Sequence, residues 1–528
     1  MSRDEDEGDV DAVIVGAGLS GAITALRLAE AGLSVLCLEQ GDWPDRAGRT
    51  PVHDPESELT AERYWQRDPD VRKDPTDYPI DNSASDITPL MWNGVGGSTV
   101  LYLAKWNRMT PGDFRVKSHD GVAADWPLSY EDLEPYYVEA ERIMRVSGTG
   151  GDPAYPPGEG PVEAGVPVRR FGKRMAKALN TLGWAWWPGA TATFRGEDGV
   201  DGLHAVKSSV DISIWPSALA AGARLQTHSR VRRVLVSEGH AVGVEYVDRS
   251  GAPKMLHAPT VILCANGIGT PRLLLMSATD EHPEGVANST GLVGKRLMMH
   301  PYGAVVGVFD DEMDSCVGPL GQQIQCMEFY ETDAARGFVR GAKWGLQPSG
   351  SAQNVLRSYP WNTETETAYF ENFHTTIRQR YDHSPLWTII AEDLPVESNR
   401  VQLSPTLVDS DGLPGVEVHY EADDNSRALL AFHTGHAAQA MTAAGAVATI
   451  SDSVVRASGW HLMGTAVMGD DPAASVTDRY GKTHDVRGLY IFDSSTWVTS
   501  GGLNPAATQS ALALWSSDHL IEQRGETR

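Results

Sequence analysis

A strand, a glycine turn, a helix and a second strand at the start of the chain constrain its fold more than any other feature. Residues 12–15, AVIV, are a short apolar run rich in β-branched residues, as expected of a buried parallel strand. The motif Gly16-x-Gly18-x-x-Gly21 follows, then apolar residues at helical spacing and a second strand-like run that ends in Glu39. This order predicts a Rossmann-like βαβ unit that binds a dinucleotide, and with it an α/β fold.

Each part of this motif has a physical role. Gly16 permits the tight turn, Gly18 lets a pyrophosphate approach the backbone, and Gly21 lets the helix pack closely on the strand. The first turn of the helix, which holds Ser20, offers free N–H groups and the positive end of the helix dipole to phosphate. Glu39 can accept hydrogen bonds from the adenosine ribose, which disfavours NADP. This segment does not separate FAD from NAD.

Composition excludes several classes of function. The 528 residues include 70 acidic and 44 basic residues, a net charge of −26, which argues against binding of nucleic acid or of an anionic membrane. The charge serves either solubility or the attraction of a cationic substrate. No apolar run reaches the ~18 residues of a membrane span, and the acidic N-terminus lacks a secretion signal, so we expect a cytoplasmic protein. The 4 cysteines show no metal-binding spacing, so we expect no metal site.

The middle of the chain predicts more strands and a second domain. Residues 224–236 and 241–247 have the pattern of neighbouring strands. Residues 260–277 combine a strand, a small-residue turn and a helix, which would return the chain to the first sheet. Residues 313–450 differ in character, with alternating strand-like pieces, many turns and a helix at about 425–445. We therefore predict a second domain of α+β type there.

Two polar side chains stand out near the C-terminus. Residues 458–469, SGWHLMGTAVMG, hold one histidine, His461, among small and apolar residues. Alone, this pattern fits a buried histidine bonded to backbone as well as a general base. Residues 503–522 predict a helix with Asn504 as its N-cap and Pro505 in its first turn.

The motifs, taken in order, resemble those of the glucose–methanol–choline (GMC) family of flavin oxidoreductases. The resemblance covers nearly the whole length of the chain. It rests on the N-terminal fingerprint and on the segments GGSTV at 96–100, WPLSYEDLEPYY at 126–137, VILCANGIGTPRLLL at 261–275, GLVGKRLMMHP at 291–301, WHLMGT at 460–465 and LNPAAT at 503–508.

The resemblance implies FAD and a catalytic pair made of His461 and Asn504. It implies an FAD-binding domain at 1–312 plus 452–528, with surface excursions at 42–90 and 147–200, and a substrate-binding domain at 313–451. It places Asp493 at the ribityl or pyrophosphate group, Val231 near the adenine, and Gly97 and Ser98 along the isoalloxazine. The full set of cofactor-binding residues that we expect is Gly16, Gly18, Ser20, Gly21, Glu39, Gly97, Ser98, Val231, Ala265, Asp493, Asn504 and Pro505.

One departure from the family bears on how the flavin is held. Some members attach FAD covalently through a histidine in the segment after the paired glycines. Here that segment, STVLYLAKWNRMTP at residues 98–111, contains no histidine. We therefore expect noncovalent FAD.

The expected reaction is oxidation of an alcohol to a carbonyl compound. A neutral imidazole, with a pKa of about 6.5, can accept the hydroxyl proton near neutral pH. Asn504 can donate a hydrogen bond to the same oxygen. We expect a sugar, glycoside or polyol as substrate; the alternatives are a small apolar or aromatic alcohol, an amino-sugar hydroxyl, and, less favoured, a lyase reaction. Oxygen, a quinone or another protein would take the electrons.

We expect structural rather than catalytic roles for the other candidate residues. We expect His300, which precedes a proline, to cap local structure. We expect the tryptophan cluster at 184–187 to pack in a core or at a domain contact rather than stack on a sugar. Asp393 and Glu397 are interpreted as part of a solvated turn, and Cys264 as an inert thiol in a buried strand.

Overall fold

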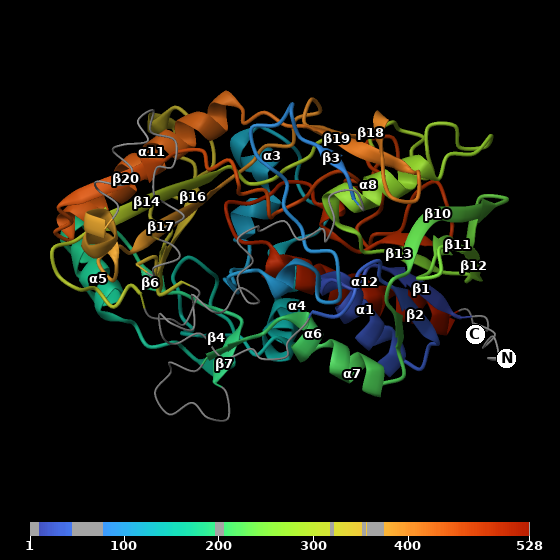
Figure 1. Ribbon diagram of the computed structural model, residues 1–528, viewed down its shortest axis with the longest axis horizontal. Helices are drawn as coiled ribbons and strands as arrows, with labels where there is room; N and C mark the ends of the chain where they lie inside the picture. The colour runs from blue at the N-terminus through green and yellow to red at the C-terminus, as the bar shows by residue number, and fades with distance from the viewer. Residues whose placement is uncertain are drawn as a thin grey trace.

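The structure is a computed structural model that describes residues 10–44, 78–195, 205–316, 322–350, 355 and 374–526. Within these residues the molecule is elongated and has two parts, one around a parallel sheet and one around an antiparallel sheet (Figure 1). Residues 45–77 of the predicted excursion at 42–90, and 196–204 at the end of the second one, lie outside the described residues.

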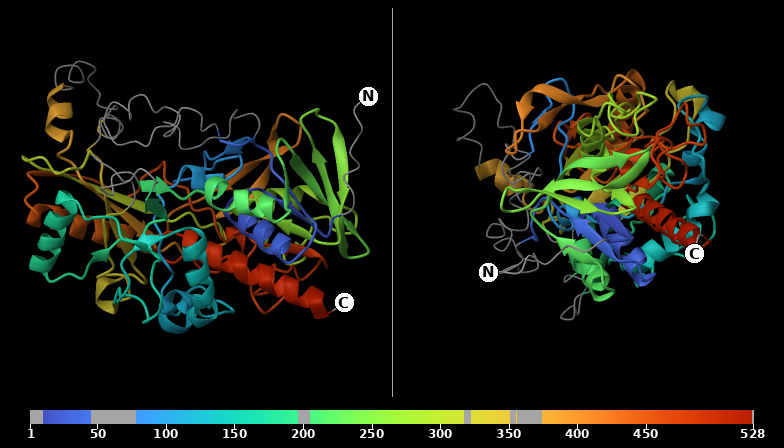
Figure 2. Two further views of the ribbon diagram at one scale, coloured as in Figure 1. Left: turned by 90° about the horizontal axis from the view of Figure 1, so that it is seen from below. Right: turned by 90° about the vertical axis from the view of Figure 1, so that its right-hand side faces the viewer.

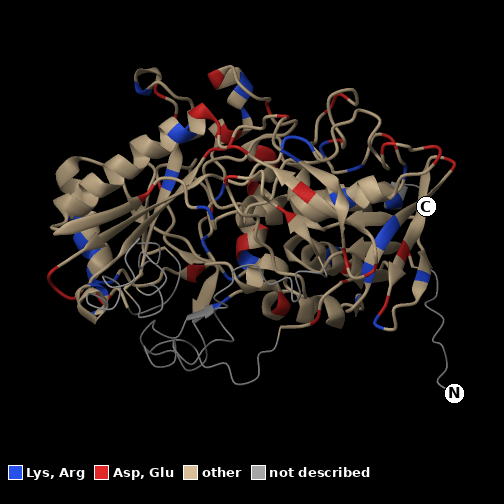
Figure 3. Cartoon of the chain, turned by 45° about the horizontal axis from the view of Figure 1, so that its top comes forward, with Lys and Arg blue, Asp and Glu red and all other residues tan. Residues whose placement is uncertain are grey.

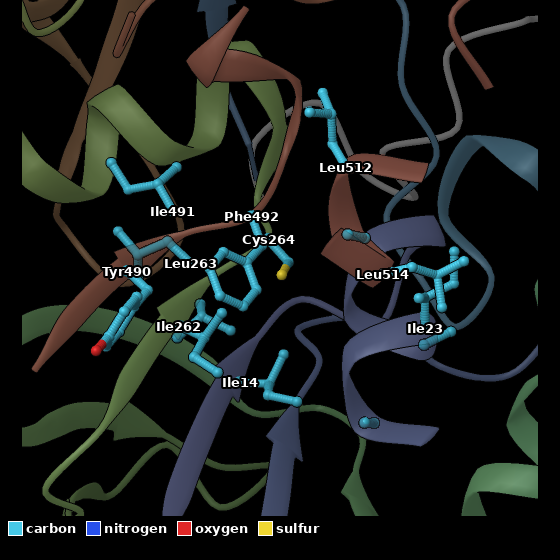
Figure 4. Close-up of a cluster of buried hydrophobic side chains, with 14 of the residues drawn as sticks. Ile14, Ile23, Ile262, Leu263, Cys264, Tyr490, Ile491, Phe492, Leu512 and Leu514 are labelled. Atoms are coloured by element: carbon cyan, nitrogen blue, oxygen red, sulfur yellow. The ribbon is translucent and has the colours of Figure 1, made fainter. Parts of the chain in front are cut away.

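The parallel sheet begins with the N-terminal fingerprint, as predicted. Its strands follow the order β21-β13-β1-β2-β9, and each pair of neighbours is parallel. Such a sheet is covered on both faces, which explains the apolar, β-branched composition of its central strands. Figure 4 shows side chains of β1, β13 and β21 packed together in this core. The strands are β1 Ala12–Val15, β2 Val35–Leu38, β9 Arg224–Gln226, β13 Val261–Leu263 and β21 Leu489–Ile491.

Helices from distant parts of the chain pack around this sheet. α1, Leu19–Glu30, lies beside α12, Ala506–Glu526, although the two are at opposite ends of the sequence (Figure 2). α4, Tyr130–Ile143, also packs on α12, and Ser129 and Asp132 form a capping box at its start. α8, Asn266–Met276, follows β13 as expected.

The second part is built on a wholly antiparallel sheet. Its order is β20-β14-β17-β16-β15-β6, and α11, Asp424–Ala443, packs on one face of it. The strands are β6 Trp187–Pro188, β14 Tyr302–Val308, β15 Ile324–Cys326, β16 Ala342–Gln347, β17 Leu386–Ala391 and β20 Ala448–Asp452. Two of these strands, β6 and β14, come from outside residues 313–451, so the division of the chain at those positions stays a prediction.

Smaller elements complete the described chain. The predicted strand at 224–236 is two strands: β9 joins the parallel sheet, and β10, Arg230–Ser237, begins four residues later. β10 pairs antiparallel with β11, His240–Val247, so the prediction of neighbouring strands holds for this part of the run. The other strands are β3 Ile80–Asp81, β4 Ser147–Gly148, β5 Glu163–Ala164, β7 Thr193–Arg195, β8 Ala205–Lys207, β12 Pro253–His257, β18 Arg400–Val408 and β19 Pro414–His419. The other helices are α3 Val116–Asp120, α5 Arg170–Leu182, α6 Val210–Ser213 and α7 Trp215–Ala220, with 3₁₀ turns at Gly97–Val100, Pro111–Phe114, Ala334–Arg336 and Ser494–Thr496.

Candidate active site

A cavity of about 550 Å³ runs between the two parts of the molecule. Its volume lies within the range of small-molecule and cofactor sites, about 300–1,000 Å³. Of the residues expected to bind the cofactor, all but Gly21 line it: Gly16, Gly18, Ser20, Glu39, Gly97, Ser98, Val231, Ala265, Asp493, Asn504 and Pro505. His461 lines it as well. The structure therefore gathers sequence segments that are hundreds of residues apart around one space.

Glycines shape the end of the cavity at the fingerprint. Gly16 has a φ of 103°, and a Cβ on it would lie 2.5 Å from the carbonyl oxygen of Cys264. A Cβ on Gly97 would lie 2.8 Å from the Cα of Gly18, so these two backbones touch. Gly21 lies behind the turn, where a Cβ would lie 1.9 Å from the carbonyl oxygen of Gly16. This last contact is the close helix–strand packing expected of the third glycine.

The two predicted acidic residues lie in the cavity wall, each held by backbone N–H groups. Glu39 accepts hydrogen bonds from the N–H of Ala17 at 2.8 Å and of Gly41 at 2.9 Å. Asp493 accepts from the N–H of Asn266 at 3.1 Å and of Ser495 at 2.8 Å. Burial raises the pKa of both carboxyl groups. Their contacts with ribose and ribityl groups stay predictions.

At the other end of the cavity, His461 forms a hydrogen bond with a second histidine. Nδ1 of His461 lies 2.8 Å from Nδ1 of His300. Nε2 of His300 lies 2.5 Å from the carbonyl oxygen of Gly501 and 3.2 Å from that of Ser500. The sequence interpretation of His300 as a local cap is wrong, since its ring contacts residues about 160 to 200 positions away.

These contacts determine which nitrogen of His461 is free. A carbonyl oxygen only accepts, so Nε2 of His300 carries a hydrogen. Burial lowers the pKa of His300 to about 4, so the ring is neutral and its Nδ1 is an acceptor. His461 must then donate from Nδ1, which leaves the lone pair of its Nε2 for the cavity. Burial, with His300 and two lysines nearby, also lowers the pKa of His461 well below 6.5.

Asn504 is oriented in a similar way by a buried lysine. Nζ of Lys343 donates to Oδ1 of Asn504 at 2.7 Å, to Oδ1 of Asn107 at 3.0 Å and to Oε1 of Gln322 at 2.8 Å. Three amide oxygens thus meet the three N–H groups of an ammonium. Because its oxygen is bonded to Lys343, Asn504 has its NH₂ group left for the cavity that it lines.

A chain of amides fixes the direction of these hydrogen bonds. Nε2 of Gln325 donates to the carboxylate of Asp152 at 2.6 Å, so Oε1 of Gln325 accepts from Nδ2 of Asn107 at 2.6 Å. Oδ1 of Asn107 therefore faces Lys343. Lys343 is fully buried, and burial together with the neighbouring Lys105 lowers its pKa well below 10.5.

Two buried lysines, Lys105 and Lys343, lie near His461, although the protein as a whole is acidic. Acidic and basic residues are interspersed over both parts of the molecule (Figure 3). Lys105 lines the cavity, and its Nζ donates to Oγ1 of Thr388. Burial lowers the pKa of Lys105 to about 7. Lys105 in the cavity lining and Lys343 bonded to Asn504 both help to lower the pKa of His461.

Two buried acidic residues, Glu392 and Asp393, form hydrogen bonds with the loop before α12. Glu392 accepts from the N–H of Gly501 at 3.1 Å, and burial raises its pKa to about 8. Asp393 accepts from the N–H of Met299 at 2.7 Å, and its own N–H donates to Ser500 at 2.8 Å. The interpretation of Asp393 as part of a solvated turn is wrong, because the residue is 2% exposed and burial raises its pKa to about 7.

The remaining sequence interpretations can be compared with the structure. Glu397 is exposed, as a solvated turn requires. Trp184 packs edge-on against Phe329 and Trp344, and none of the tryptophans at 184–187 lines the cavity, which agrees with packing. The helix start differs by one position: the carbonyl of Pro505 accepts from the N–H of Gln509 at 2.8 Å, so Pro505 takes the place expected for Asn504.

Comparison with known proteins agrees with this architecture. A family model described as "GMC oxidoreductase" matches residues 10–302, and a second model with the same description matches residues 395–513. The chain belongs to the GMC oxidoreductase family. The resemblance stated from the sequence and the predicted fold class are thereby confirmed.

Individual members of the GMC family are similar over their whole length. The chain is 39% identical to 2-methyl-1,2-propanediol dehydrogenase of Mycolicibacterium austroafricanum, covering 98% of this chain and 96% of the relative. It is 29% identical to the fructose dehydrogenase large subunit of Gluconobacter japonicus, covering 97% of each. The crystal structure of pyridoxine 4-oxidase from Mesorbium loti superposes with a TM-score of 0.66 at 17% identity, covering 97% of this chain and 99% of that one, which supports the fold.

GMC oxidoreductases are flavoproteins, and the residues present fit FAD. The close contact of Gly18 and Gly97 leaves room for a ligand beside the backbone, and Gly18 caps α1 without a side-chain hydrogen bond, so the first N–H groups of that helix are open to a pyrophosphate. Among the described residues, none of the helices has the length and apolar character needed to cross a lipid bilayer.

Proposed function

We propose that this GMC oxidoreductase oxidises one hydroxyl of a small polyhydroxylated substrate, a diol, polyol or sugar, to a carbonyl group. The observation that carries the proposal is the hydrogen-bonded chain from Gly501 through His300 to His461. It supports a general base whose Nε2 lone pair faces the cavity, at the end remote from the fingerprint. His461 accepts the hydroxyl proton there.

Asn504 supports the same oxygen as its proton leaves. Its NH₂ group, left free by the bond from Lys343 to its oxygen, donates a hydrogen bond to the developing alkoxide. α12 begins two residues later, at Ala506, and its N-terminus also borders the cavity, where its positive dipole end favours negative charge. Bound FAD supplies the acceptor for the hydride that leaves the carbinol carbon.

The buried lysines bear on the class of substrate. A substrate carrying its own ammonium group would meet the amine of Lys105, which lines this end of the cavity, and this argues against the amino-sugar alternative. A wholly apolar alcohol would leave the polar groups of this end without partners, which is costly. A neutral substrate with several hydroxyl groups suits the site, in keeping with the diol and the sugar named for the two relatives.

The test is anaerobic reduction of the flavin. Purified holoenzyme is mixed with a panel of diols, polyols, sugars, amino sugars and monoalcohols, and the flavin absorbance at about 450 nm is followed. Bleaching by diols, polyols or sugars supports the proposal. Bound flavin that none of the panel reduces would contradict it and favour the lyase alternative. Admission of air afterwards separates an oxidase, which returns to yellow at once, from a dehydrogenase that needs another acceptor.

We also propose that FAD is bound noncovalently. The segment after Gly97 offers no histidine for attachment. Acid precipitation should therefore release all the yellow colour into the supernatant. Flavin that remains with the precipitated protein would contradict this.

A further inference from the structure

One face of the antiparallel sheet borders the cavity, and Tyr302, Gln347 and Ile390 of its strands line it. Side chains alternate along a strand, so Trp344 and Leu346 of β16 point into the core beneath α11. Lys343 and Gln347, with Gly345 between them, lie on the opposite face. The neighbouring strands place Thr388 beside Gly345, and Tyr302 in the same row as Lys343. This polar wall extends well beyond His461 and Asn504, the two residues that the proposed chemistry uses.

Lys105 extends over this wall, and its Nζ carries N–H groups for which the described residues provide no acceptor besides Thr388. Gly345 has no side chain, and a Cβ there would lie 3.4 Å from Nζ of Lys105, so the glycine makes room for the lysine. Lys105 is 4% exposed and lines the cavity. Among the described residues, Thr388 is the one hydrogen-bond partner of its Nζ. Thr388 in turn donates to the carbonyl of Gly345 at 2.9 Å, so the lysine must donate to the threonine.

Gln347, the next residue along the same face, has an acceptor, Oε1, that lacks a donor among the described residues. It lines the cavity, and its Oε1 is buried with no hydrogen-bond partner in the described part of the chain. A buried acceptor without a partner costs about 1–3 kcal/mol, and buried polar groups are normally satisfied. The cavity wall thus presents an unused donor from Lys105 and an unused acceptor from Gln347.

A hydroxyl group is the chemical group that both accepts and donates. We propose that Lys105 and Gln347 bind a second hydroxyl of the substrate, so that the enzyme selects diols and polyols over alcohols with a single oxygen. The inference rests on the proposed alcohol oxidation and adds the residues that set its specificity. A carboxylate would suit Lys105 but would meet the carbonyl oxygen of Gln347, and an ammonium group would meet the lysine. A neutral hydroxyl satisfies both residues.

The test uses two alcohols with one carbon skeleton, 2-methylpropane-1,2-diol and 2-methylpropan-1-ol. The kcat/KM of flavin reduction is measured for both with holoenzyme, and glycolate serves as the carboxylate probe. We expect wild type to prefer the diol at least about tenfold, since a site built to bind a hydroxyl rejects the analogue that lacks it. Lys105→Met, which keeps the chain length and removes the donors, should lower the diol-to-monoalcohol ratio roughly 10- to 100-fold.

Further variants keep the test decisive. Gln347→Leu should lower the ratio about five- to tenfold and answers the question if Lys105→Met loses FAD. Lys117→Met, at an exposed lysine of α3, is the matched control and should leave the ratio unchanged. A wild-type ratio near one, an equal slowing of both alcohols by Lys105→Met, or a preference for glycolate would each overturn the proposal. Failure of the proposed function looks different, because then no alcohol reduces the flavin at all.

Discussion

Replacement of His300 tests how the candidate base is held. In His300→Leu the N–H at Nδ1 of His461 loses its acceptor, because the bond of 2.8 Å to Nδ1 of His300 disappears. A buried donor without a partner costs about 1–3 kcal/mol, which equals a factor of roughly 5 to 150 in rate if the reactive tautomer bears that cost. We therefore expect kcat for flavin reduction to fall about 10- to 100-fold while FAD stays bound.

His300→Asn is the matched control. Its side-chain oxygen can occupy the position of Nδ1 and accept from His461, and asparagine tolerates the φ of 53° found at this position better than most residues. Stopped-flow reduction at saturating alcohol should place this variant within about fivefold of wild type. If His300→Leu reduced its flavin at wild-type speed, or if the asparagine variant were as slow as the leucine variant, the tautomer argument would be refuted.

Three further predictions follow from the same geometry. Lys343→Met should lower kcat about tenfold, because the amide of Asn504 loses the hydrogen bond that orients it. The double variant Lys343→Met with Asn504→Ala should be no slower than Asn504→Ala alone. Additive losses in the stopped-flow rates would argue against a coupling between Lys343 and Asn504. The pKa of His461 is lowered well below 6.5, so the neutral, active imidazole persists at mildly acidic pH. The value of kcat/KM should therefore stay constant as pH falls to 6.5. A decrease of kcat/KM with a midpoint at or above pH 6.5 would contradict this prediction. Burial raises the pKa of Asp393 to about 7, so the stability that this carboxyl group contributes is complete below the unfolded pKa of about 4 and is lost as pH rises through 7. Asp393→Asn removes this pH dependence, so the free energy of unfolding should change less between pH 5.5 and 8.5 than in wild type, by up to a few kcal/mol. The difference in Tm between these two pH values measures the effect, and a difference equal to that of wild type would count against the argument.

Much of the fold could be predicted because its signals are local. The turn at Gly16 and the small-residue turn within residues 260–277 each lie within a few residues, and the structure places the strands and helices beside them where the sequence predicts. The apolar runs at β1 and β13 likewise show that both faces of the parallel sheet are covered. The boundary of the second domain is harder, since β6 reaches the antiparallel sheet from far upstream through strand pairing that no local pattern encodes.

The candidate site was predicted in part, and the missing residues share a cause. His461 and Asn504 stand in distinctive motifs, whereas the residues that orient them, His300 and Lys343, each lie 161 positions away from the residue they contact. One signal was available: β16 alternates polar and apolar residues, which marks Lys343 as facing away from the core. Asp393 was misjudged because burial of a carboxyl group depends on distant segments, here Met299 and Tyr420.

The most direct test of the account is the rate of anaerobic flavin reduction in His461→Ala. Wild type and variant, matched for FAD content, are mixed with the best alcohol of the panel in a stopped-flow instrument. The account predicts that the variant keeps its FAD and is reduced roughly 10²- to 10⁴-fold more slowly, the usual contribution of a general base. Reduction of the variant at wild-type speed would contradict the assignment of His461 as the base and, with it, the central claim about this site.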